Sequence, residues 1–129
     1  MSSNKDEPTP KTVVWIGSSK DDISELPSEV KLVLGQALYF AQIGLKHPDA
    51  KPLTGIEGGV LEVVEDFNKN TYRAVYKVQL GDVVYVLHVF QKKSKSGKET
   101  PKPDIDLIKS RLKLAKQDHE RRTKAKGKS

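Results

Sequence analysis

Three runs of strand-forming residues, 60–67, 71–79 and 83–91, follow one another with only short polar turns between them. The second run alternates regularly, with Tyr72 and Tyr76 on the face opposite to its basic residues. This period of two is typical of a strand that buries one face. The third run is apolar on both faces, as in a central strand. Because the turns are short enough for hairpins, the sequence predicts an antiparallel three-stranded meander.

An amphipathic helix is predicted before the meander. Asp22 and Glu25 have the spacing of a capping box, and Pro27 is tolerated in a first helical turn. Apolar residues then recur at three- and four-residue steps through residues 30–41, which indicates one buried helix face. Gly44 follows as a natural stop. We therefore expect one helix from about Asp22 to Gly44.

The remaining segments complete a small α+β domain. Residues 12–16 predict a short first strand, residues 47–59 a loop, and Asp104 the start of a last helix that loses its apolar pattern after Gln117. The expected order is strand, helix, loop, meander and helix. The predicted parts are a disordered arm at 1–11, one domain at 12–117 and a frayed basic tail at 118–129.

Charge is distributed unevenly along the 129 residues. The chain carries a net +6, but residues 12–90 sum to −3 and residues 91–129 to +9. A basic last third is consistent with a polyanionic ligand, an acidic partner or a solvated tail, and composition does not choose among these.

Several classes of protein are excluded by composition. Cysteine is absent, which removes disulfides, thiolate catalysis and sulfur-based zinc sites. His47, His88 and His119 are far apart, so we expect no metal site and no cofactor. The sequence has no run of about 20 apolar residues to span a membrane. Its start lacks the apolar core of a secretory signal, so we expect a cytoplasmic protein.

The chemically informative feature is the polar face of the meander. Arg73 and Lys77 share this face on the second strand, and Glu62 lies on the neighbouring strand. On the third strand, His88 and Lys92 are an even number of residues apart, so they share a face as well. We expect this face to be open to solvent, while the Tyr72 face packs on the first helix. Such a cluster can promote RNA self-cleavage without a metal, in which a 2′-hydroxyl attacks the adjacent phosphate.

Each residue has a candidate role and a structural alternative. Arg73 would clamp the phosphate, His88 would act as acid or base, and Lys92 or Lys93 would do so if nearby cations depress its pKa. Alternatively, His88 is a hydrogen-bonded structural histidine, Arg73 and Glu62 form an ordinary cross-strand ion pair, and the lysines are a solvated run.

The chain resembles the phage-derived, HigB-like branch of the RelE/ParE toxin superfamily, from about Trp15 to about Ala115. The most specific pieces are Leu87-His88-Val89-Phe90-Gln91-Lys92-Lys93 at the end of the third strand and Thr100-Pro101 before the last helix, and further pieces are Leu38-Tyr39-Phe40-Ala41-Gln42-Ile43-Gly44, Ala50-Lys51-Pro52-Leu53, Gly58-Gly59-Val60-Leu61-Glu62 and Thr71-Tyr72-Arg73-Ala74-Val75-Tyr76.

The resemblance implies the toxin of a type II toxin–antitoxin pair with a RelE-like fold, blocked by a cognate antitoxin. Its RNase members cleave mRNA, commonly at the ribosome, and basic residues at the positions of Arg73 and of Lys92 and Lys93 bind and activate the scissile phosphate. We therefore expect a metal-independent endoribonuclease. The predicted catalytic residues are Arg73, Lys92, Lys93, His88 and Glu62, with Glu62 as orienting partner, and the predicted RNA-binding residues are Lys77, Lys95, Lys98 and Arg111.

Two other functions stay open. One is a ParE-like inhibitor of DNA gyrase without nuclease chemistry. The other is a degenerate toxin that only binds its regulator.

Overall fold

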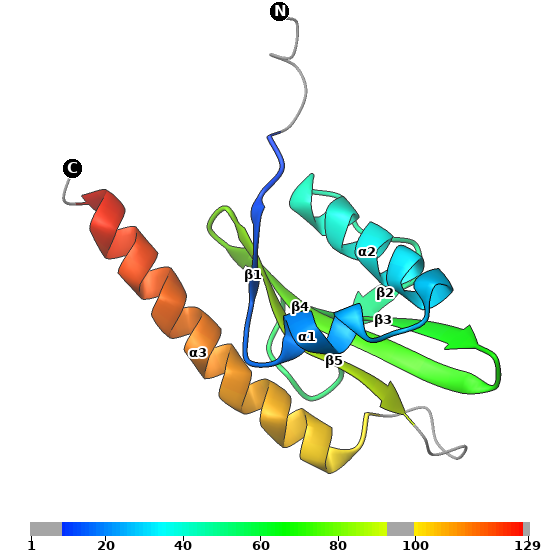
Figure 1. The fold of residues 1–129 in the computed structure, drawn as a ribbon. Coiled ribbons are helices and arrows are strands. Elements are labelled where there is room, and N and C mark those ends of the chain that lie inside the picture. The colour runs from blue at the N-terminus through cyan, green and yellow to red at the C-terminus, as the bar shows by residue number, and fades with distance from the viewer. Residues whose placement is uncertain (1–8, 93–99, 128–129) are drawn as a thin grey trace, which may run out of the picture.

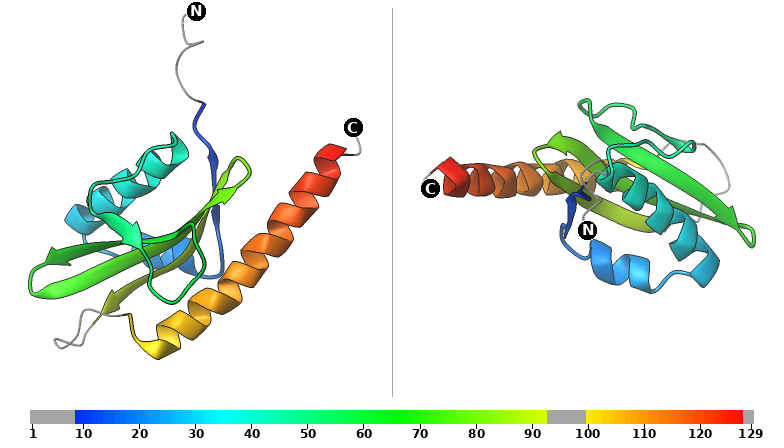
Figure 2. Two further views of the ribbon diagram at one scale, coloured as in Figure 1. Left: turned by 180° about the vertical axis from the view of Figure 1, so that it is seen from behind. Right: turned by 90° about the horizontal axis from the view of Figure 1, so that it is seen from above.

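A computed structural model of the chain describes residues 9–92 and 100–127. One five-stranded sheet, in the order β1-β5-β4-β3-β2, separates α1 and α2 on one face from α3 on the other (Figures 1 and 2). The elements are β1 (Thr12–Trp15), α1 (Ser19–Ser24), α2 (Ser28–Gln42), β2 (Ala50–Pro52), β3 (Val60–Phe67), β4 (Asn70–Leu80), β5 (Val83–Lys92) and α3 (Lys102–Gly127).

The predicted meander is confirmed, and so is the α+β class. β3, β4 and β5 pair antiparallel in sequence order. β1 adds to the outer edge of β5 in parallel, with Thr12 opposite Val83. The expectation of a loop at 47–59 is wrong in part, because β2 forms there and pairs with β3. A three-residue strand is too short to produce a readable alternation, which is why the sequence pattern did not indicate it.

The expectation of one continuous N-terminal helix is also wrong. Pro27 has an extended conformation, with ψ 148°, and precedes α2 as its N-cap, while α1 ends at Ser24. The predicted capping box does not form, since Asp22 lies inside α1 and Glu25 is its C-cap. A proline disfavours helical geometry in the residue before it, so it divides the segment into two helices.

Gly44 ends α2 as expected. Its φ is +81°, its N–H donates to the carbonyl of Ala41 at 3.1 Å, and the N–H of Leu45 donates to Phe40 at 2.7 Å. These two bonds form a Schellman motif, which satisfies the last helical carbonyls and requires a left-handed residue that glycine adopts without a steric penalty.

Each face of the sheet has its own core. The α2 side buries Tyr72, Ala74, Tyr76 and Val63 against Val30, Leu34, Ala37, Leu38 and Ala41. The α3 side buries Val75, Tyr85 and Leu87 against Ile108, Leu112 and Ala115. The last three residues recur at helical spacing, so α3 presents one apolar stripe to the sheet.

A β-bulge in β5 controls which residues face α3. Val75 lies opposite His88, but the next residue, Tyr76, lies opposite Val86, so Leu87 is the extra residue. The bulge allows Leu87 to enter the α3-side core while His88 contacts a residue of α3.

The prediction that the helical pattern gives way to a frayed tail after Gln117 is wrong, because α3 runs to Gly127. Asp118 joins this part to the sheet by accepting a hydrogen bond from the Tyr85 hydroxyl at 2.8 Å. It also pairs with Arg122 one turn later, at 2.6 Å. Within the described residues, no helix has both the length and the apolarity to cross a membrane.

Candidate functional site

The candidate site is a polar cluster between the sheet and the start of α3. Arg73 of β4 and Glu62 of β3 lie diagonally across the strand pair, and Arg73 Nη1 donates to Glu62 Oε2 at 3.0 Å. Thr100, just before α3, contacts both partners, at 3.3 Å from Arg73 Nη1 and 3.2 Å from Glu62 Oε2. The cross-strand ion pair that the sequence allowed is therefore present, with a threonine hydroxyl above it.

The expectation that this face is open is wrong. The exposed fraction is 5% for Glu62, 4% for Arg73, 4% for Lys77, 7% for His88 and 7% for Lys92. The reason is that α3 must bury its own apolar stripe, and the apolar residues that β4 and β5 contribute to this face give it a surface to pack on. The polar residues of the same face are covered together with them.

His88 pairs with a residue that sequence reasoning missed. Its Nε2 lies 2.8 Å from Oδ1 of Asp104, and its ring stacks on Phe90 with centroids 4.4 Å apart. Among the described residues its Nδ1 is buried and has no hydrogen-bond partner. Glu62, the predicted orienting partner, is bound to Arg73. The sequence indicates Asp104 only as a helix start, because acidic residues are common in a first helical turn.

The ammonium group of Lys77 is bound by other groups of the protein. It donates to Glu57 at 3.1 Å and to the carbonyl of Gly58 at 2.7 Å, which fastens the loop between β2 and β3 to the sheet. Lys116 of α3 pairs with the same carboxylate. Hydrogen bonds from Lys116 and then Lys77 lower the pKa of Glu57. Lys77 is therefore held inside the protein and not presented to a ligand.

Arg111 joins three elements. Its Nη1 donates to the carbonyl of Leu87 in β5 at 3.0 Å, and its Nη2 donates to the hydroxyl of Ser18 at 3.2 Å. Its guanidinium also packs against Gly17, where an added Cβ would lie 2.7 Å from the guanidinium carbon. This arginine holds α3 on the sheet. Of the other predicted site residues, Lys92 is buried at the end of β5, and Lys93, Lys95 and Lys98 lie outside the described residues.

A hollow of about 310 Å³ opens beside the ion pair. Its lining comes from β2 and the two residues after it, from Glu62 and Thr100 of the polar cluster, and from the first turn of α3. Its lining residues are Lys51, Pro52, Leu53, Thr54, Glu62, Thr100 and Ile105. This hollow is a route by which a ligand can reach the cluster.

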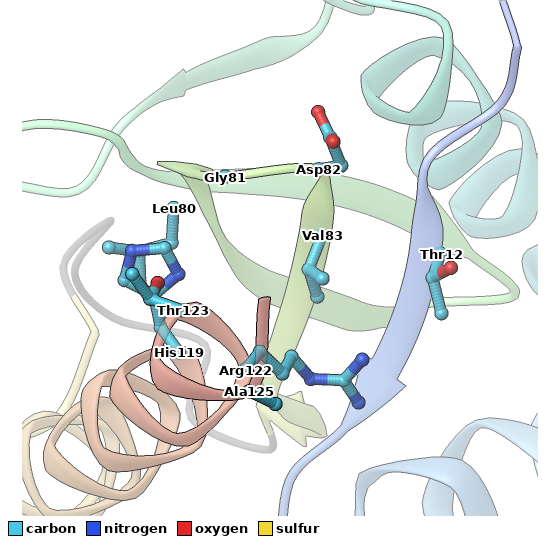
Figure 3. A pocket seen from close by; sticks show the side chains of 9 residues that line it. All are labelled: Thr12, Leu80, Gly81, Asp82, Val83, His119, Arg122, Thr123 and Ala125. Carbon is cyan, nitrogen blue, oxygen red and sulfur yellow. The ribbon is translucent and has the colours of Figure 1, made fainter. Parts of the chain in front are cut away.

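A second hollow, of about 430 Å³, lies between the last turns of α3 and the β4–β5 hairpin (Figure 3). Leu80 and Val83 supply apolar surface, and Asp82, His119 and Arg122 supply polar groups. Arg122 extends toward β1 in this view. Hydrogen bonding to Asp118 raises the pKa of Arg122. In the part of the chain that the structure describes, no three His, Asp or Glu residues are grouped as metal ligands.

Comparisons with known proteins identify the family. A chain of the toxin–antitoxin complex RelBE2 from Mycobacterium tuberculosis is structurally similar, with a TM-score of 0.46 and 19% sequence identity over 65% of this chain and all of that chain. Among curated proteins, no sequence matches. The family model for phage-derived Gp49-like proteins matches residues 21–113, from α1 to the middle of α3. The chain thus belongs to the family of phage-derived, Gp49-like proteins.

Proposed function

We propose that this protein is the toxin of a type II toxin–antitoxin pair. It cleaves mRNA at the ribosome without a metal, and a cognate antitoxin neutralises it. The observation that carries the proposal is that Arg73 is bound to Glu62 and Thr100, and that these two partners line an open hollow. An arginine beside a cavity is suited to a two-pronged grip on a phosphate. Family membership and the resemblance of the β4 and β5 sequences to RelE-like RNases support the same function.

The proposed reaction is transfer of the phosphate within the RNA strand. A base takes the proton of a 2′-hydroxyl, the 2′-oxygen forms a bond to the adjacent phosphorus, and the bond from phosphorus to the 5′-oxygen breaks. An acid gives a proton to that leaving oxygen. The products are a 2′,3′-cyclic phosphate and a 5′-hydroxyl, so no other reactant is needed.

The residues divide these tasks. Arg73 offsets the charge that builds on the phosphate. His88 is the candidate base, because its Nε2 faces the Asp104 carboxylate and its Nδ1 has no partner among the described residues. Lys92 is the candidate acid, and Lys93 is a further candidate cation.

A second function is favoured by the burial of the cluster. A protein whose candidate catalytic groups are each less than a tenth exposed is suited to act by binding, as a gyrase inhibitor or as a ligand of its regulator. Apolar side chains exposed on and just after α2, Leu32, Tyr39 and Leu45, would serve such contacts.

Expression of the chain alone in a bacterium, followed within minutes by mapping of transcript 5′ ends, tests the proposal. RNase action predicts new 5′-hydroxyl ends inside coding regions. Arg73→Lys retains the charge that pairs with Glu62 but loses the two-pronged grip, so it should remove most of the cleavage. Lys20→Ala on α1 is the control. Growth arrest with intact transcripts would contradict RNase action, and a supercoiling assay would then test gyrase.

A further inference from the structure

The basic residues that the sequence predicts for the site, where the structure describes them, are either buried or bound to other groups of the protein. Lys51, beside the cluster, differs from them. Lys51 of β2 is exposed and lines the hollow of about 310 Å³. Within residues 9–92 and 100–127, its side chain forms no hydrogen bond or ion pair. By contrast, the ammonium of Lys77 is bound to Glu57 and the guanidinium of Arg73 to Glu62.

The sheet register fixes where Lys51 lies. It is directly opposite Glu62 in the β2–β3 ladder, so the two side chains leave the same face of the sheet. Arg73 and Thr100 already occupy Oε2 of Glu62. Lys51 is therefore an exposed cation that lines the hollow, and the buried Arg73 is bound to Glu62, which lines the same hollow.

We propose that Lys51 binds a backbone phosphate of a single-stranded RNA whose nucleotide enters this hollow. The volume and chemistry fit one nucleotide, since Leu53 and Ile105 give apolar surface while Thr54 and Thr100 add hydroxyls. A lysine on a flexible stem is suited to a phosphate as a point charge. The inference rests on the proposed function because it names the residue that first meets the RNA of that site.

Fluorescence anisotropy with a labelled 2′-O-methyl RNA tests the proposal on the full chain, because this RNA lacks the attacking hydroxyl and stays intact. Affinity is measured from low to moderate salt for the wild type, Lys51→Ala, Lys51→Arg and Lys20→Ala. Lys20 is an exposed lysine of α1, across the sheet, and its loss changes the net charge equally. Thermal melting confirms that all four chains are folded.

Loss of one phosphate contact should reduce the slope of log K against log salt by about 0.7 and weaken binding about fivefold at 0.1 M salt. Lys51→Arg should retain the wild-type slope. Equal slopes for Lys51→Ala and Lys20→Ala, or no RNA binding by the wild type, would overturn the proposal.

Expression of the same proteins in a bacterium, with mapping of transcript 5′ ends to measure cleavage, separates this inference from the RNase proposal. Lys51-dependent binding without cleavage would refute the nuclease and leave the Lys51 contact standing. If Lys51→Ala and Lys20→Ala reduce cleavage equally, the Lys51 contact would be refuted and the nuclease would stand.

Discussion

Arg73 and Glu62 form an ion pair across β3 and β4 in which the side chains are only 4% and 6% exposed. Glu62→Ala would leave the guanidinium buried without its carboxylate, and removing one partner of a buried pair costs about 3–5 kcal/mol. We expect a loss of that order in the free energy of unfolding, measured by urea denaturation.

Two variants make this prediction specific. Glu62→Leu combined with Arg73→Leu should be less destabilising than Glu62→Ala alone, because no charge stays buried. Asp106→Ala breaks an exposed pair with Lys102 on α3 and should cost at most about 1 kcal/mol. Equal losses for Glu62→Ala and Asp106→Ala would mean that the buried pair does not stabilise the fold.

Two buried tyrosines should respond oppositely to removal of the hydroxyl. Tyr85→Phe loses the hydrogen bond to Asp118, so it should destabilise by about 1 kcal/mol and speed amide exchange in α3 beyond Ala115. The Tyr76 hydroxyl is buried with no partner among the described residues, so Tyr76→Phe should be neutral or stabilising. The expectation fails if both variants lose the same stability.

Stability should fall steeply in alkali. Burial raises the pKa of Tyr76 to about 12, and burial followed by the hydrogen bond to Asp118 raises that of Tyr85 to about 12. An unfolded tyrosine titrates near pH 10, so the unfolded chain releases these protons first as pH rises. The free energy of unfolding should therefore decrease between about pH 10 and pH 12. Urea midpoints across this range measure it, and Tyr76→Phe should flatten the decrease.

Two glycines offer a matched pair of alanine substitutions. Gly17 has φ +61° and packs on the Arg111 guanidinium, so Gly17→Ala should cost at least about 1 kcal/mol. Gly35 lies inside α2, and an added Cβ would meet nothing within 4 Å. Gly35→Ala should therefore stabilise by about 0.4–1 kcal/mol, because alanine favours helix and restricts the unfolded chain. Thermal melting of the two variants should show shifts of opposite sign.

The sequence predicts the meander and the α2 face because both depend on local periodicity. Alternation along β4 and the three- and four-residue spacing in α2 are visible within about a dozen residues. The end of α2 at Gly44 is predicted by an equally local signal. Pro27 is also a local signal for the break between α1 and α2, since proline disfavours helical geometry in the residue before it. The sequence does not distinguish such a break from a proline in the first turn of one continuous helix.

The covered face could not be predicted in this way. Whether Arg73 meets solvent depends on where α3 lies, and α3 is far from β4 in sequence. The Asp104–His88 contact joins two elements through a bulge that shifts the register of β5. The sequence does not indicate the position of Lys51 either, because its pairing opposite Glu62 depends on a strand that is only three residues long.

The parallel pairing of β1 with β5 has a consequence for the order in which the protein can be completed during synthesis. Thr12 pairs with Val83, about 70 residues later, so β1 has no partner strand until β5 has left the ribosome. The α3-side core must wait longer, until residues 108–115 emerge. A nascent chain therefore carries an unfinished sheet until β5 has emerged, and the candidate site is completed only after Thr100 and the start of α3 have followed it.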